Sequence, residues 1–128
     1  MQREPVQTYC SPAFKAITKK HRTFEKDFSQ AYTLLNQQLC PKKAERPLTP
    51  KHLVRIHQSD GFEIWKFQVM VRGLRPGQWP RLWVGVASAE GILVPLALGM
   101  HGDNYRDNDM EEIAITTMKG YCAALHEN

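Results

Sequence analysis

The amino-acid sequence lacks any apolar run close to the roughly 20 residues that a helix needs to cross a lipid bilayer. Residues 1–10 also lack the apolar segment that marks a secretory signal peptide. Both absences argue against a membrane-bound or exported protein, so we expect a soluble protein of the cytoplasm. With 128 residues, of which 42% are hydrophobic, the chain is long enough for one domain and too short for two comfortable ones.

Cysteine is scarce, and its spacing matters more than its number. Cys10, Cys40 and Cys122 form no C-x-x-C pair, which argues against a disulfide framework and against a zinc knuckle. The oxygen-rich segment 101–109 lacks the glycine at the sixth position and the distant closing glutamate of a calcium loop. We therefore expect buried thiols, no metal site and no cofactor.

Charge is distributed unevenly along the chain. Residues 1–81 carry fifteen Lys and Arg against six Asp and Glu, whereas residues 82–128 carry two against seven. A basic first part indicates an anionic partner, either nucleic acid or an acidic protein segment. Ordinary solubilising charge is the alternative explanation.

The first third of the chain has the pattern of a helical hairpin. Residues 6–10 are predicted to form a short strand, and Ser11 followed by Pro12 supplies an N-cap and a first-turn proline. Apolar residues, together with His21, then recur at three- and four-residue steps, namely Phe14, Ile17, His21, Phe24, Phe28, Leu35 and Leu39. Thr23 has the residue type of a second N-cap, which favours two helices over one long helix.

The middle of the chain is predicted to form a sheet. After a proline-rich loop at 41–50, strands are predicted at residues 53–57, 62–71, 81–87 and 92–98. Pro95 cannot donate to a ladder, so it should mark a bulge or an unpaired edge. Glu90 and Gly91 are predicted to form a tight turn between the last two strands.

A terminal helix completes the predicted fold. Asp109 and Glu112 have the spacing of a capping box, and the helix that they open carries Ile113, Met118, Tyr121 and Leu125. The fold class is therefore α+β, with a small twisted, mainly antiparallel sheet, an N-terminal helical hairpin and a C-terminal helix.

Two predicted strands carry cationic residues on the side opposite their regularly spaced apolar residues. Alternation puts Trp65 and Phe67 on one side of strand 62–71 and Lys66 on the other. The next strand places Arg81 and Trp83 on the side opposite its valines. We therefore expect Lys66 and Arg81 to share one surface that suits a phosphate backbone.

Three segments carry a resemblance to a known family. They are S-P-A-F-K-A-I-T-K-K-H at 11–21, L-V-R-I-H-Q-S-D-G-F-E-I-W-K-F-Q-V at 53–69 and P-R-L-W-V-G-V at 80–86. Together with the order of elements, they resemble the RelE/ParE toxin superfamily of bacterial toxin–antitoxin systems. The resemblance covers most of the chain and implies a RelE-like fold for residues 1–128.

For RelE-type members, the resemblance implies metal-independent cleavage of mRNA in the ribosomal decoding site. The implied partners are the ribosome, mRNA and an acidic antitoxin that neutralises the toxin. Such chemistry needs fixed cations at the reacting phosphate. The implied catalytic residues are Lys66, Arg81, His101, Tyr105 and Arg106.

Further residues are candidates for RNA binding. They are Lys15, Lys19, Lys20, Arg72, Arg75 and Trp83, of which Trp83 could stack on a base. The alternatives for individual residues are a lysine reaching toward water, an Arg81–Glu63 ion pair and a solvated hairpin tip at Arg72 and Arg75. The aspartates of segment 103–109 make this loop anionic, which weakens the case for a nuclease site unless they face away or cap the last helix.

Two other functions fit the same resemblance. A ParE-like protein would block DNA gyrase without cleaving a substrate. A RelE-fold protein without toxicity would serve as a nucleic-acid or protein-binding module.

Overall fold

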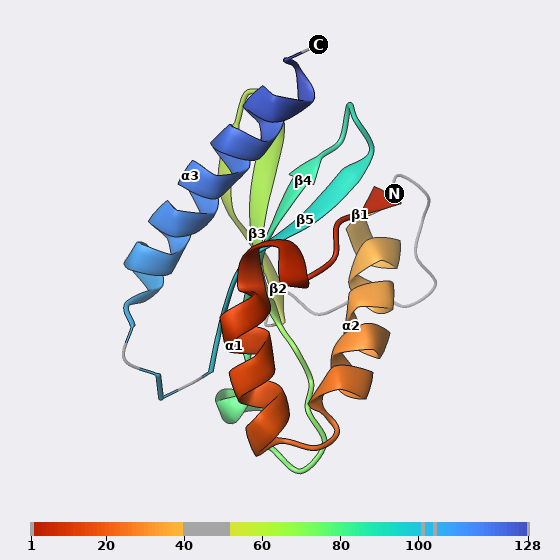
Figure 1. Ribbon diagram of the computed structural model, residues 1–128, viewed down its shortest axis with the longest axis vertical. Coiled ribbons are helices and arrows are strands. Elements are labelled where there is room, and N and C mark those ends of the chain that lie inside the picture. Colours follow the sequence, from red (N-terminus) through yellow and green to blue (C-terminus); the bar gives the residue numbers. More distant parts are fainter. Residues whose placement is uncertain (1, 40–51, 101, 104, 128) are drawn as a thin grey trace.

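The computed structural model describes residues 2–39, 52–100, 102–103 and 105–127. Within these residues the chain forms an α+β arrangement of three helices and one five-stranded mixed sheet (Figure 1). In chain order the elements are β1 (Gln2–Arg3), α1 (Gln7–Lys20), α2 (Phe24–Leu39), β2 (Leu53–Ser59), β3 (Phe62–Gln68), a 3-10 turn (Pro76–Gln78), β4 (Arg81–Ala87), β5 (Ile92–Gly99) and α3 (Asp107–Leu125). This confirms the predicted fold class at the level of element order.

The sheet has the strand order β1-β5-β4-β3-β2. The pairs β2–β3, β3–β4 and β4–β5 are antiparallel, and the two-residue β1 joins β5 in parallel. The register of β5 shifts between Pro95, which faces Val84, and Ala97, which faces Trp83. This irregularity next to Pro95 confirms the predicted bulge, and Gly91 forms the predicted turn with a φ of 69°.

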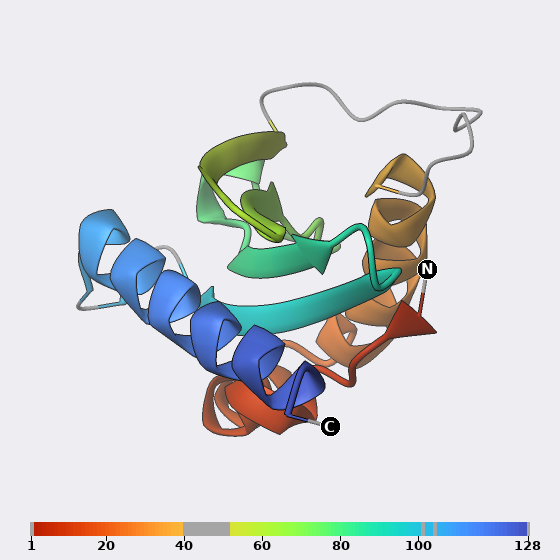
Figure 2. The same cartoon turned by 90° about the horizontal axis from the view of Figure 1, so that it is seen from above.

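Helices cover both faces of the sheet. Figure 2 shows α3 on one side, α2 on the other and α1 beneath the β5 edge. Alternate residues of β4 enter two cores: Leu82, Val84 and Val86 pack with α1 and α2, whereas Trp83 and Ala87 pack with α3. The expectation that the Lys66 side of these strands takes no part in a core was wrong, because Ile64 and Trp83 on that side pack against α3.

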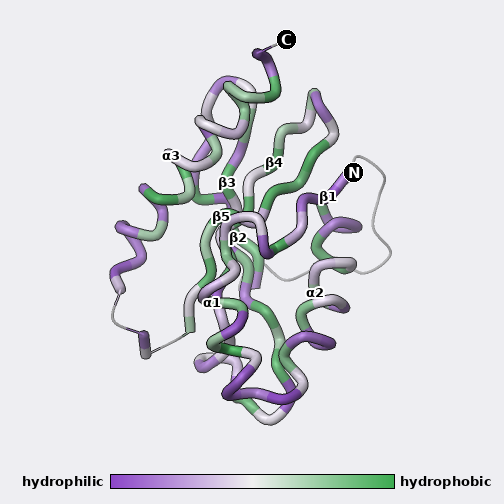
Figure 3. Tube along the Cα trace, in the orientation of Figure 1, coloured by the Kyte–Doolittle hydropathy of each residue, from purple (hydrophilic) through white to green (hydrophobic). Residues whose placement is uncertain are grey.

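The helical hairpin is confirmed, but its start differs from the prediction. Residues 6–10 are not a strand, since α1 already begins at Gln7 and a non-helical backbone at Cys10 separates its first turn from the rest. The buried residues Val6, Cys10, Phe14 and Ile17 follow helical spacing. Figure 3 shows the hydrophilic colouring that dominates the C-terminal half of α1, which carries the lysines.

Helix α3 begins three residues earlier than a helix with Asp109 as its N-cap would. Its first residue is Asp107, so the predicted capping box of Asp109 and Glu112 is wrong. Of the apolar residues on this helix, Met118 is buried, whereas Ile113 and Leu125 are exposed. Helix α3 approaches β4 closely, because a Cβ on Gly85 would fall 2.4 Å from the Met118 sulfur.

The remaining predictions about elements and thiols have mixed outcomes. Cys10 is buried, and burial raises its pKa to about 12, while Cys122 is half-buried. Cys40 and the predicted loop at 41–50 lie outside the described residues. None of the helices in the described part of the chain is both long and apolar enough to cross a membrane.

Candidate functional site

Lys66 and Arg81 meet at the start of α3. The Lys66 Nζ atom lies 3.2 Å from Asp107 Oδ2, and the Arg81 Nη1 atom lies 3.8 Å from Asp107 Oδ1. The Asp107 carboxylate therefore forms an ion pair with each cation, through a different oxygen for each. We call Lys66, Arg81, Tyr105 and Asp107 the cation cluster.

The sheet register brings these residues together. Lys66 faces Trp83 across the β3–β4 ladder, and Arg81, two residues before Trp83, points to the same side. Arg81 opens β4 opposite Gly99, which closes β5. The chain then passes through Tyr105 into α3, so the cluster lies where two strand ends and a helix start meet.

The cluster is partly shielded from water. The side chains of Lys66, Arg81 and Asp107 are 27%, 24% and 50% exposed. Partial exposure keeps each ion pair in the weak range of surface pairs, about 0.2–1 kcal/mol. The helix macrodipole also favours an anion at this end of α3. Two cations and the N-terminus of α3 therefore stabilise a negative charge at this site.

Tyr105 lines the cluster from the loop before α3. Its ring packs edge-on against Trp83 at 6.0 Å between centroids, and a Cβ on Gly99 would fall 2.6 Å from its Cε1 atom. Burial raises the pKa of the phenol; Arg81 opposes this, and Asp107 and Asp103 add to it. The hydroxyl of Tyr105 is buried and lies near Arg81. Within the described residues, no donor or acceptor meets the distance and angle limits of a hydrogen bond to this hydroxyl. Tyr105 is therefore a neutral phenol near neutral pH and can act as a proton donor.

Other residues predicted for the catalytic set have different outcomes. Arg106 is exposed, and its main-chain carbonyl caps the first turn of α3 by accepting from Asp109 and Met110. Its side chain pairs with no other described residue. His101 lies outside the described residues, so its role stays a prediction. The Asp103 carboxylate accepts the Met100 main-chain N–H, 2.8 Å away, in the turn before the cluster.

Trp83 cannot serve as the base-stacking residue that we predicted. Its side chain is 1% exposed and belongs to the core under α3. The predicted alternative of an Arg81–Glu63 pair is also wrong. Glu63 instead pairs with Arg55 at 2.9 Å and accepts a hydrogen bond from the Trp65 indole.

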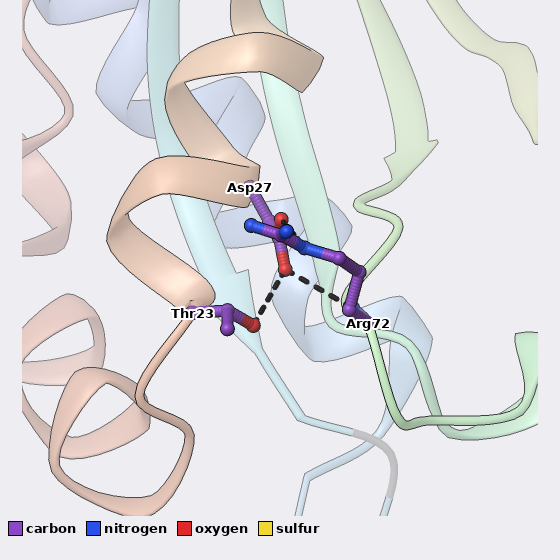
Figure 4. A network of polar contacts seen from close by, with 3 residues as sticks. All are labelled: Thr23, Asp27 and Arg72. Atoms are coloured by element: carbon purple, nitrogen blue, oxygen red, sulfur yellow. Dashed lines mark hydrogen bonds and ion pairs between the residues drawn. The ribbon is translucent and has the colours of Figure 1, made fainter.

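Arg72 has a structural partner on α2. Its main-chain N–H and its Nε both donate to the Asp27 carboxylate, at 3.0 and 2.9 Å, and the Thr23 hydroxyl donates to the same group at 2.7 Å (Figure 4). Asp27 is 5% exposed, whereas the Arg72 side chain is 59% exposed. This Asp27 network ties the start of α2 to the turn after β3, so Arg72 is exposed as the alternative prediction had it but also makes a specific contact.

The other RNA-binding candidates lie on open surface. Arg75 is exposed beside the 3-10 turn, and Lys15, Lys19 and Lys20 are exposed on α1. No hydrogen bond or ion pair within the described residues joins these lysines to the cation cluster. The three lysines belong to α1, where Lys20 lines a small pocket together with Met100 and Asp103.

Sequence reasoning missed a cavity of about 310 Å³ between α2 and the sheet. The side chains that line it are Asp27, Gln30, Ala31, Leu34, His52, Phe67, Gln68, Met70, Arg72 and Trp79. Phe67 and its neighbours face the helical hairpin, so this cavity lies on the opposite side of the sheet from the cation cluster.

Searches of protein-family models, curated proteins and solved structures gave no significant match to this chain. Within the described residues, no group of three or more His, Cys, Asp or Glu side chains is placed to hold a metal ion. Assignment of a function therefore depends on the chemistry of the cation cluster.

Proposed function

We propose that this protein is a RelE-like toxin that cleaves ribosome-bound mRNA by a metal-independent mechanism. The observation that carries the proposal is the convergence of Lys66 and Arg81 on one carboxylate. Two cations that hold both oxygens of a carboxylate can hold two oxygens of a phosphodiester in the same way. The order of elements, a helical hairpin followed by antiparallel strands and a terminal helix, supports the same proposal.

The cluster supplies groups for phosphodiester transesterification. The RNA 2′-oxygen loses its proton and bonds to the adjacent phosphorus, while the bond from phosphorus to the 5′-oxygen breaks. Lys66 and Arg81 stabilise the negative charge that grows on the phosphate oxygens. Tyr105, neutral and beside Arg81, donates a proton to the leaving 5′-oxygen. The products are a 2′,3′-cyclic phosphate and a 5′-hydroxyl. The 2′ proton passes to a general base that the sequence leaves open, and His101 stays a candidate for assisting proton transfer.

The basic surface of α1 supplies the second part of the proposal. Lys15, Lys19 and Lys20 are exposed on α1 and are not members of the cation cluster. In the proposed complex they contact ribosomal RNA and add affinity without taking part in bond cleavage. An acidic antitoxin would neutralise the protein by covering this same surface.

Cleavage of mRNA in a reconstituted translation reaction tests the proposal. Lys66→Gln with Arg81→Gln should lower the cleavage rate at least about 100-fold, since each removes a charge at the reacting phosphate. Lys26→Gln with Lys119→Gln removes the same charge from exposed positions outside the cluster and should leave the rate within about twofold. A 2′-deoxy nucleotide at the cleaved position should block the reaction. Equal loss in both double variants, or cleavage of the deoxy substrate, would contradict the mechanism.

One observation favours a second candidate, an RNA-binding module that does not cleave. Asp107 already neutralises part of the cationic charge of the cluster, which lowers its capacity to stabilise a transition state. Under this alternative the protein would bind single-stranded RNA through Lys66 and Arg81, and incubation would leave the RNA intact. Binding and cleavage measured on the same labelled RNA separate the two functions.

A further inference from the structure

Asp107 occupies the position between Lys66 and Arg81 that a bound anion would take. Each carboxylate oxygen faces one cation, at 3.2 Å for Lys66 and 3.8 Å for Arg81. A phosphate that used both cations would need the same two places. The carboxylate of Asp107 and an external phosphate therefore cannot occupy the cluster together.

Among the described residues, Lys66 and Arg81 alone hold the Asp107 side chain. Within the described residues its carboxylate forms no hydrogen bond or ion pair except those with Lys66 and Arg81. Half of the side chain is exposed to water. Because Asp107 is the first residue of α3, its charge remains stabilised by the helix terminus after the two contacts break. The carboxylate can therefore leave the cluster without entering an apolar environment and without unfolding the helix.

We propose that Asp107 is an intramolecular competitor that sets the affinity of the cluster for phosphate groups, an inference that rests on the proposed RNA-binding role of this site. A ligand phosphate displaces the carboxylate and takes over both cations. A ligand that contacts only one of the two cations leaves the ion pair between Asp107 and the other cation intact. Asp107 thus acts as a specificity-determining residue, because it favours a phosphodiester presented to both Lys66 and Arg81 over scattered anions.

Asp109 provides a matched control for this proposal. It lies in the same first turn of α3, carries the same charge and is exposed, yet it pairs with neither cation of the cluster. Asp107→Asn and Asp109→Asn therefore change the net charge and the helix-terminal charge equally. Only Asp107→Asn removes the carboxylate that pairs with Lys66 and Arg81.

Binding of a fluorescein-labelled single-stranded RNA, measured by anisotropy at fixed ionic strength, is the first arm of the test. Asp107→Asn should tighten binding by roughly 2- to 30-fold, the range expected for losing two competing exposed ion pairs. Asp109→Asn should tighten it by less than about twofold through the long-range charge alone. Equal tightening by both variants, or no tightening by Asp107→Asn, overturns the proposal. Thermal unfolding of each variant checks that α3 remains folded, and Asp107→Ser provides a second removal of the carboxylate.

Inorganic phosphate is the probe in the second arm, which does not depend on RNA cleavage. Chemical-shift changes in residues 64–67 and 81–83 on titration should give a lower Kd for Asp107→Asn than for the native protein or Asp109→Asn. Adding Lys66→Gln to Asp107→Asn should abolish the gain. Tighter phosphate binding by Asp107→Asn together with uncleaved RNA would support Asp107 as a competitor and would argue against the nuclease function. If RNA is cleaved but phosphate and RNA bind no better to Asp107→Asn, the competitor is overturned and the nuclease stands.

Discussion

Removal of the Asp27 carboxylate should destabilise the fold mainly through the main-chain N–H of Arg72. The carboxylate accepts three hydrogen bonds, from that N–H, from the Arg72 Nε and from the Thr23 hydroxyl. The Arg72 side chain is 59% exposed, so its guanidinium can regain water and contributes no more than about 1 kcal/mol. The Arg72 main-chain N–H and the Thr23 hydroxyl are half-buried and do not regain a water partner in this way. A buried polar group without a hydrogen-bond partner costs about 1–3 kcal/mol.

These contributions give an expected loss of about 2–4 kcal/mol in the free energy of unfolding for Asp27→Ala. Asp27→Asn should lose about half as much, because one acceptor oxygen remains. Arg72→Gln keeps the main-chain N–H and should lose less than about 1 kcal/mol. Urea denaturation at pH 7 measures all three variants. If Arg72→Gln proves as damaging as Asp27→Ala, the guanidinium and not the main chain carries the network, and the reasoning is wrong.

The pH dependence gives a second check on the Asp27 network. Burial raises the pKa of Asp27, but the hydrogen bonds from Arg72 and Thr23 together with the Arg72 charge outweigh it and hold the pKa below the ordinary 3.8. A depressed pKa in the folded state means that the ionised form stabilises the fold. The difference in unfolding free energy between native protein and Asp27→Asn should therefore be constant above about pH 5 and shrink as the pH falls through the folded pKa. A difference that is flat down to pH 2 would contradict this.

Two further predictions concern the packing of the helices. Gly85→Ala should lower the free energy of unfolding by about 1–3 kcal/mol, because its Cβ would overlap the Met118 sulfur, and adding Met118→Ala should cost less than the sum of the two single changes. Additivity in denaturation experiments would show that the two sites are not in contact. The Cys10 thiol, with a pKa of about 12, should resist iodoacetamide at pH 8 in the folded protein and react in 6 M urea. Rapid labelling of Cys10 in the folded state would show that α1 does not bury it.

Local patterns predicted the strands well and their environment poorly. Strand β4 has the predicted bounds, Arg81–Ala87, because its valines alternate and a proline precedes it. The assumption that Lys66 marks a solvent face failed, since Ile64 and Trp83 on that same face are buried under α3. Large apolar residues on both sides of a strand are the signal of a doubly covered sheet, and they were visible in the sequence.

The N-terminal error has a similar cause. Residues 6–10 include Val6, Thr8 and Tyr9, which are residue types common in strands, but Val6 and Cys10 also continue the four-residue spacing of Phe14. The helical alternative wins because this spacing places all three in one core. The true strand β1 has two residues and pairs with Ile92 and Leu93, about 90 positions away, so no local window contains its determinant.

The charge asymmetry of the chain also changes meaning once the fold is known. We interpreted the basic first part and the acidic second part as a sign of an external anionic partner. The structure pairs Lys66 and Arg81 from the first part with Asp107 from the second, so some of that asymmetry is satisfied within the molecule. Alternation along two neighbouring strands was sufficient to bring the two cations to one place. Their counter-charge depends on where α3 starts relative to the sheet, which no local pattern specifies. The anionic segment that argued against a phosphate site in the sequence is therefore, in the fold, what shows that the two cations can jointly hold an anion.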